Sequence, residues 1–325
     1  MNVNQENISL SAKRQVFIDL LLNLYGKYQD DQLRDLYFDD ELYRLIRCLL
    51  AVISDDNQAN TLALCSYDAL QDDESKRIFA CLFLCRCAGV NDMAGACAEM
   101  LLTVLKDRLA EKGKDLSNYD NYDQNFFLGK SYFSLPQVKS LSDMCGSKEV
   151  FIDCGAYDGR TIKDFVEFCG DKYNKIYSFE PIPRLYEKTM QNIKKAGIQR
   201  VELIQKGVWS RKAVLNFADI GMGSLIHARG AIPVEVVAID EVVPKDEEVT
   251  FIKMDVEGAE FEALKGAENT IRRCKPKLAI CIYHEPSDVI EIPALIMSFF
   301  SGYKLYIRQH NARMLTEIVL YALPQ

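Results

Sequence analysis

The chain has 325 residues, of which 49% are hydrophobic, and it carries a formal net charge of −8. This length exceeds one average domain, and the apolar content is ample for a buried core. The acidic balance weighs against a basic groove for nucleic acid and against attraction to anionic membrane surfaces. We therefore expect neither nucleic acid nor a membrane among the partners.

Eleven cysteines are present, and most lie within apolar helical patterns. Cys81, Cys85 and Cys87 resemble a metal cluster in their spacing. On a helix, however, residue 87 points away from the other two, and no second ligand group has zinc spacing. We interpret them as structural thiols of a reduced, cytoplasmic protein. Polar residues interrupt the apolar run 16–24, which predicts an amphipathic helix with no signal peptide and no membrane span.

Two patterns divide the chain. Residues 1–112 have helical periodicity and are expected to form an all-helical lobe, with candidate helices near 10–27, 31–53, 61–70, 74–88 and 92–111. Residues 113–146 are rich in Asn, Asp and Tyr and are interpreted as a linker, or alternatively as a substrate-facing aromatic loop. Strand and helix patterns alternate in residues 147–325, which predicts an α/β domain with a mostly parallel sheet.

The first strand of that domain leads into the most informative motif of the sequence. The apolar run 149–152 is followed by Asp153, Gly155 and Gly159, and a helical pattern begins after them. A dinucleotide fingerprint has a glycine where Asp153 stands, so that a pyrophosphate can approach the helix N-terminus. A carboxylate there suits a ligand with an ammonium group and no phosphate, such as S-adenosylmethionine.

Acids also stand at the ends of later strands. Glu180 ends the second strand, 27 residues after Asp153, where an acid accepts hydrogen bonds from a ribose diol. Pro181 follows and suits the face of an adenine ring. Gly207 follows the third strand and permits close approach of the backbone. Asp255 ends the fourth strand, and ligands of open α/β sheets bind at these carboxyl ends. The expected cofactor-binding residues are Asp153, Gly155, Ala156, Tyr157, Asp158, Gly159, Glu180, Pro181, Gly207, Val208 and Asp255.

Residues 147–325 resemble the FkbM family of S-adenosylmethionine-dependent methyltransferases. The resemblance rests on the runs VFIDCGAYDG, YSFEP, KGVWS, FIKMDVEGAEFEALKGAE, ICIYHEP and IVLYA. The lead-in Tyr132-Phe133 also resembles members with an N-terminal helical lobe. Arg160 departs from the pattern, which has a small or acidic residue there, and we interpret it as facing solvent. The resemblance implies a class I, Rossmann-like methyltransferase fold with a seven-stranded sheet, and O-methylation, often of sugars or natural-product hydroxyls.

Methyl transfer to a hydroxyl group needs a base in the protein or a metal-bound alkoxide. His284 follows an apolar strand at the ligand edge of the sheet, and we favour it as the general base; His310 is a second candidate. Asp255 and Glu257 give a rival assignment, because two carboxylates at a strand end can bind Mg²⁺. We do not favour a metal, since acids are also typical of a helix N-terminus. The predicted catalytic residues are thus His284, Asp255 and Glu257.

The sequence therefore predicts an O-methyltransferase that acts on a hydroxyl of a sugar, glycan or small metabolite. Two alternatives stay open: a binding or scaffold protein with a degenerate methyltransferase domain, and another nucleotide-dependent enzyme such as a dehydrogenase. Asp153 disfavours the dehydrogenase, and the intact set of acids and glycines disfavours degeneracy. The sequence leaves the oligomeric state open, a homo-oligomer included.

Overall fold

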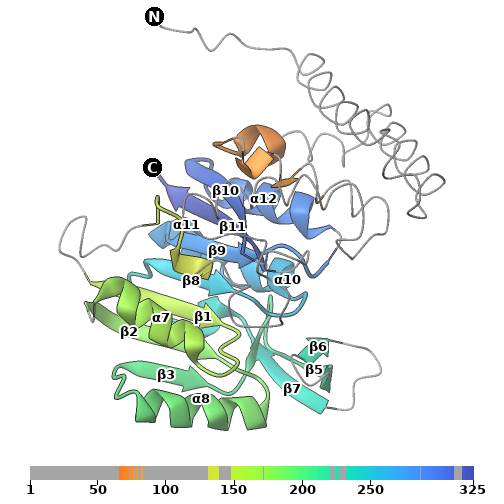
Figure 1. The fold of residues 1–325 in the computed structure, drawn as a ribbon. Coiled ribbons are helices and arrows are strands. Elements are labelled where there is room, and N and C mark those ends of the chain that lie inside the picture. The colour runs from red at the N-terminus through yellow and green to blue at the C-terminus, as the bar shows by residue number, and fades with distance from the viewer. Residues whose placement is uncertain are drawn as a thin grey trace, which may run out of the picture.

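The computed structural model describes residues 66–72, 74–76, 78, 79, 82, 131–138, 148–170, 172–219, 224–226, 232–285, 287–310 and 317–325. Within them, a seven-stranded sheet has the order β10–β11–β9–β8–β1–β2–β3 (Figure 1). Neighbouring strands are parallel except where β11 pairs with β9 and with β10. The strands are β1 (Glu149–Cys154), β2 (Tyr173–Phe179), β3 (Val201–Ile204), β8 (Phe251–Met254), β9 (Lys277–Cys281), β10 (Tyr303–Gln309) and β11 (Ile318–Pro324). The predicted α/β class and strand number are confirmed.

Both faces of this sheet are covered, which explains why its strands are continuously apolar. Every residue of β1 is buried. Side chains alternate between the faces of a strand, so Val150 and Ile152 join one core cluster and Phe151 joins another. Phe151 stacks on Phe165 of the first crossover helix, with ring centroids 4.3 Å apart. The pattern of β1 therefore orients its carboxyl end between two packed layers.

Helices follow the strands as the alternating sequence predicts. One face of the sheet packs against the first of them, and the other packs against the last three (Figure 1). Pro183 stands in the first turn of α8, where its missing N–H costs nothing. The helices are α7 (Arg160–Cys169), α8 (Pro183–Lys195), α9 (Ile239–Val242), α10 (Glu260–Lys265), α11 (Glu268–Cys274) and α12 (Asp288–Phe299).

A smaller sheet of four strands lies between β3 and β8 in the chain and extends to one side of the molecule (Figure 1). Its order is β4–β7–β5–β6, and β5 and β7 form an antiparallel pair. Val236 and Phe217 pack in its core with Ile182, just after β2. The small sheet therefore supports one wall beside the end of β2. Its strands are β4 (Gly207–Val208), β5 (Ala213–Asp219), β6 (Ser224–Ile226) and β7 (Ile232–Val237).

A described part of the expected N-terminal lobe packs directly on the main sheet. Leu70 forms an isolated parallel bridge with Leu305 of β10, and Phe79 is fully buried in the core cluster of the sheet. Arg308 binds Asp72 at 2.6 Å and Glu74 at 3.1 Å. Most of residues 1–112 lie outside the described residues, so the partition into a lobe and a domain stays a prediction.

The expected linker 113–146 is described only at residues 131–138. There, the short 3₁₀ helix η3 (Ser131–Phe133) places Tyr132 and Phe133 in buried positions. The Phe133 ring lies 5.1 Å from that of Phe168 and 5.3 Å from that of Phe251. This stretch is thus part of the core. In the part of the chain that the structure describes, no helix has the length and apolar character needed to cross a membrane.

Candidate active site at the carboxyl ends of the strands

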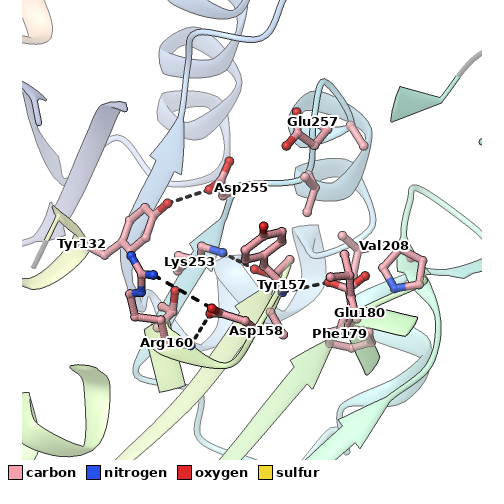
Figure 2. Close-up of a pocket in the computed structure, with 18 of the residues that line it drawn as sticks. Tyr132, Tyr157, Asp158, Arg160, Phe179, Glu180, Val208, Lys253, Asp255 and Glu257 are labelled. Atoms are coloured by element: carbon pink, nitrogen blue, oxygen red, sulfur yellow. Dashed lines mark hydrogen bonds and ion pairs between the residues drawn. The ribbon is translucent and has the colours of Figure 1, made fainter. Parts of the chain in front are cut away.

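A cavity of about 770 Å³ opens at the carboxyl-end edge of the main sheet (Figure 2). This volume lies in the usual range for small-molecule sites, about 300–1,000 Å³. Residues from the ends of β1, β2, β8 and β9 line it, together with the beginning of β11 and with β4. The sheet topology therefore produces one site where the sequence predicts several separate strand-end motifs.

The turn after β1 requires glycine. Gly155 has φ +86°, and a Cβ atom there would lie 2.0 Å from the carbonyl oxygen of Asp255. The backbone amides of Gly155 and Ala156 both donate to the carbonyl of Phe179, at 3.1 and 3.0 Å. The loops after β1, β2 and β8 are thus held in contact, and they form the floor of the cavity.

Asp153 does not line the cavity, which corrects the expectation that it contacts a ligand. It is fully buried inside β1, in register with Lys253 of β8. The Asp153 carboxylate binds the Lys253 ammonium at 3.2 Å and accepts a hydrogen bond from Ser178 at 3.0 Å. Lys253 also donates to the carbonyl oxygens of Cys154 and Gly155, at 3.0 and 2.6 Å. The pair therefore supports the turn from behind.

Lys253 keeps its charge although it is buried. Burial alone would lower its pKa, but the carboxylates of Asp153 and Asp255 outweigh that effect and hold the pKa above its ordinary value. A buried charge is tolerated only when it is paired and hydrogen-bonded, as here. One fixed cation therefore lies beneath the loops after β1 and β8.

Glu180 lies at the end of β2, as the sequence predicts, and it lines the cavity. Its two carboxylate oxygens accept hydrogen bonds from the backbone amides of Tyr157 at 2.8 Å and Ile182 at 3.0 Å. Burial raises the pKa of Glu180 to about 7 in spite of these bonds. The carboxylate thus has a fixed orientation, and its charge depends on pH near neutrality.

Asp255 follows β8 and accepts hydrogen bonds from two phenols. Tyr132 donates at 2.8 Å to one carboxylate oxygen, and Tyr283 donates at 3.3 Å to the other. Burial opposes ionisation, but Lys253, His284 and the Tyr132 hydrogen bond hold the pKa of Asp255 below its ordinary value. Asp255 is therefore a fixed anion and a weak proton acceptor.

The turn between β8 and α10 is organised by Glu260. One Glu260 oxygen accepts from the amide of Val256 at 2.8 Å, and the other accepts from the amide of Gly258 at 3.0 Å. Glu257 lies between them with φ +54°, a left-handed conformation that is uncommon for a side-chain-bearing residue. The Glu257 side chain is 37% exposed, and the residue lines the cavity. Glu260 therefore acts as a support, while Glu257 faces the opening.

His284 lies among these carboxylates and is not one of the residues that line the cavity. Its Nδ1 lies 2.8 Å from Glu260, and its Nε2 lies 3.6 Å from both Asp255 and Glu257. Burial lowers its pKa, but Glu260 and then the other two carboxylates raise it to about 9. The imidazole is thus mostly protonated at neutral pH, which removes the ordinary pKa on which its predicted role as general base depended.

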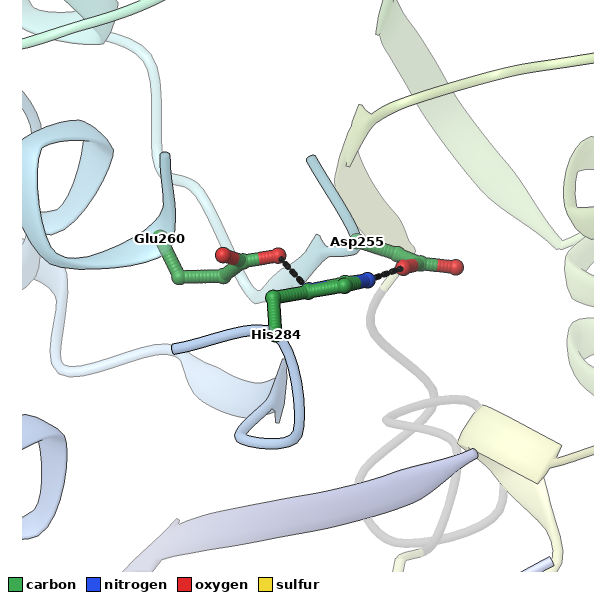
Figure 3. Close-up of side chains that lie close together, drawn as sticks. All are labelled: Asp255, Glu260 and His284. Carbon is green, nitrogen blue, oxygen red and sulfur yellow. Dashed lines mark ion pairs between the residues drawn. The ribbon is translucent and has the colours of Figure 1, made fainter. Parts of the chain in front are cut away.

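A metal ion fits this group less well than a proton does. Asp255, Glu260 and His284 each offer a ligand atom, and these atoms lie within 4.8 Å of one another. However, Figure 3 shows the imidazole between the two carboxylates, so that each ring nitrogen faces a different one. A single ion would bind one ring nitrogen and gather its other ligands around that atom. The geometry corresponds to an imidazolium between acids.

Most of the sequence-predicted residues come together at the cavity, and three do not. Asp153 is buried behind it, Gly159 caps α7 with φ +81°, and His284 lies behind the carboxylates. Arg160 has a side chain that is 71% exposed, as expected. The predicted residues that line the cavity are Gly155, Ala156, Tyr157, Asp158, Glu180, Pro181, Gly207, Val208, Asp255 and Glu257.

Sequence reasoning missed the cavity roles of Tyr132, Tyr283 and Glu317. Tyr283 directly precedes His284, so the end of β9 was a signal for both. Tyr132 lies in the expected linker, and the resemblance pointed to it without a role. Glu317 precedes an antiparallel strand, and a search restricted to the carboxyl ends of parallel strands passes over it.

Comparison with known proteins agrees with this geometry. Residues 153–314 match the family model described as the methyltransferase FkbM domain. The chain belongs to the FkbM methyltransferase family. This FkbM-family protein is accordingly assigned to the S-adenosylmethionine-dependent methyltransferases with a Rossmann-like fold. None of the curated proteins matches the chain.

Solved structures resemble this FkbM-family protein in fold. Methyltransferase FkbM from Methylobacillus flagellatus has a TM-score of 0.55 and 22% identity, over 89% of this chain and 62% of that one. The chain thus spans about six tenths of the length of that protein. An rRNA methylase from Streptococcus thermophilus has a TM-score of 0.35 and 18% identity, over 55% of this chain and 87% of that one. Fibrillarin from Aeropyrum pernix, with natively bound S-adenosyl-L-methionine, has a TM-score of 0.34 and 13% identity, over 55% and 66%.

Proposed function

We propose that this FkbM-family protein transfers the methyl group of S-adenosylmethionine to a hydroxyl group of a sugar, glycan or small metabolite. The observation that carries the proposal is a single cavity with two chemically different ends. Glu180 and the glycine turn after β1 lie at one end, and Asp255 and Glu257 lie at the other. The first end suits a nucleoside, and the second suits an acceptor with hydroxyl groups.

The donor set at the first end fits the cofactor. Glu180 has a fixed carboxylate that can accept hydrogen bonds from a ribose diol, because each oxygen retains a lone pair beyond its amide contact. Pro181 and Val208 offer apolar surface for the adenine, and the turn at Gly155 leaves backbone groups accessible for the amino-acid end. When bound, S-adenosylmethionine supplies an electrophilic methyl group on a sulfonium cation.

The second end presents carboxylates and phenols. Asp255, Glu257, Tyr132 and Tyr283 line it, and groups of this kind hydrogen-bond to hydroxyls and repel phosphates. The acceptor oxygen forms the new bond to carbon, the carbon–sulfur bond breaks with its electron pair remaining on sulfur, and the hydroxyl proton passes to a base. Fixed negative charge at this end would also stabilise a sulfonium nearby.

Calorimetry separates this proposal from its two alternatives. The protein is titrated with S-adenosylmethionine, with S-adenosylhomocysteine and with NAD under the same conditions. Binding of the first two without NAD is the expected result. Binding of NAD alone would favour a dehydrogenase, and the absence of binding by all three would favour a scaffold protein with a degenerate site.

Transfer itself is measured with methyl-labelled S-adenosylmethionine and a panel of methyl glycosides as hydroxyl acceptors. We expect the label to appear on sugar oxygen and to do so equally after treatment with EDTA, because the imidazolium occupies the centre of the candidate metal group. Loss of transfer in EDTA with recovery in Mg²⁺ would instead support a metal bound through Asp255 and Glu257.

A further inference from the structure

The position of Glu317 follows from the direction of one strand. Because β11 is antiparallel to β9, the beginning of β11 lies at the same edge of the sheet as the carboxyl end of β9. The amide of Ile282 donates to the carbonyl of Ile318 at 3.0 Å, and the amide of His310 donates to the carbonyl of Glu317 at 2.9 Å. These bonds hold Glu317 beside the end of β9.

The conformation of Glu317 also sets it apart. Its φ is +59°, a left-handed value that L-residues with a side chain seldom adopt. Such strain costs free energy, persists only where the surroundings impose it, and is concentrated at functional sites. The side chain of Glu317 lines the same cavity as Asp255 and Tyr283.

Three carboxylates line the β8 and β11 side of the cavity, and they differ in their partners. Asp255 accepts hydrogen bonds from two phenols, and Glu257 lies 3.6 Å from the His284 imidazolium. Among the described residues, the Glu317 carboxylate makes no hydrogen bond and no ion pair. Its lone pairs are therefore available to a ligand in the cavity.

We propose that Glu317 is the general base that accepts the proton of the acceptor hydroxyl, an inference that rests on the function proposed above. As the oxygen–methyl bond forms and the carbon–sulfur bond breaks, the hydroxyl proton moves to the Glu317 carboxylate. The products are the methyl ether, S-adenosylhomocysteine and neutral Glu317, which then returns the proton to solvent. The charges balance, because one cation and one anion become two neutral groups.

The electrostatic surroundings suit this role. Burial raises the pKa of Glu317 to about 7, and the charge of Asp255 adds to the effect. Glu257 acts in the same direction, whereas Lys253 and His284 act in the opposite one. A base is most effective when its pKa lies near the working pH, since it is then both ionised and a good proton acceptor. Asp255, with its lowered pKa, lacks the second property.

The test compares the full-length wild-type protein with Glu317→Gln, with Glu257→Gln, and with Glu291→Gln as a matched control on the exposed face of α12. Transfer from labelled S-adenosylmethionine to the methyl glycoside panel is measured between pH 5.5 and 9, at roughly the range around the expected pKa. Affinity for S-adenosylhomocysteine, measured by calorimetry, reports whether each variant is folded with an intact cofactor site.

We expect Glu317→Gln to lower kcat by about 10²–10⁴, the usual contribution of a general base, with little change in affinity for S-adenosylhomocysteine. In the wild-type protein, kcat/KM should fall as the pH drops below the pKa of Glu317, and this acid limb should disappear in Glu317→Gln and persist in Glu257→Gln. Glu291→Gln should match the wild type throughout.

Two results would overturn the inference while leaving the proposed function intact. One is a Glu317→Gln protein that retains both its rate and its acid limb. The other is an acid limb that disappears in Glu257→Gln, which would transfer the role to Glu257. A wild-type protein that binds S-adenosylmethionine but methylates no glycoside would refute the sugar-hydroxyl function, and the base with it.

Discussion

The charge of His284 can be measured through protein stability. Its pKa is raised from 6.5 to about 9 by the carboxylates of Glu260, Asp255 and Glu257, which exceed the opposing effect of burial. At about 1.4 kcal/mol for each pKa unit, this difference corresponds to about 3 kcal/mol of folding free energy. Because the folded pKa is the higher one, the contribution is complete below pH 6.5 and is lost as the pH rises through 9.

Replacement of His284 by Gln removes this contribution, and urea unfolding at several pH values measures it. Below pH 6.5 the variant should be less stable than the wild type, and the difference should shrink by about 3 kcal/mol as the pH rises past 9. Glu180 and Glu317 also have raised pKa values, but they titrate at lower pH and are common to both proteins. A difference that stays constant with pH, or an imidazole NMR signal that titrates near 6.5, would refute the ion-pair account and restore His284 as a candidate base.

Three further predictions concern the cofactor site and the core. Glu180→Gln should weaken S-adenosylmethionine binding in calorimetry by about 1–3 kcal/mol, and should abolish the gain in affinity that ionisation of Glu180 gives the wild type as the pH rises through 7. Gly155→Ala should lose cofactor binding, since its Cβ would collide with the Asp255 carbonyl; Gly170→Ala, with φ +55° but open space, should show only backbone strain in thermal unfolding and retain binding. Arg308→Met should lower the free energy of unfolding by about 3 kcal/mol, because it leaves two carboxylates without their cation, and a loss below 1 kcal/mol would contradict this.

The sequence was sufficient to predict the main sheet, for a physical reason. Strands of a parallel sheet are buried on both faces, so runs such as 149–152 and 249–254 are apolar without alternation and are followed by helical patterns. The residue types that end such strands are exposed to ligands, which is why Glu180 and Asp255 were found. These features depend on local sequence alone.

The errors and omissions arise from contacts between distant segments. Asp153 lies within β1, one residue before its end, and its burial depends on Lys253, which lies at the same register position of β8. The pKa of His284 depends on Glu260, which also supports the neighbouring turn. Glu317 reaches the site only because the last strand runs in the opposite direction. Strand register and direction cannot be deduced from a single sequence.

The contact between residues 66–82 and β10 determines the smallest portion of this protein that can be transplanted or expressed alone. A fragment that begins at residue 147 would expose Leu305 and leave Arg308 without its partners, at the hairpin whose second strand begins beside Glu317. It would also remove fully buried side chains such as Phe79 from the core. Domain-swapped chimeras of this protein should therefore take their N-terminal boundary before residue 66, outside the region that matches the family.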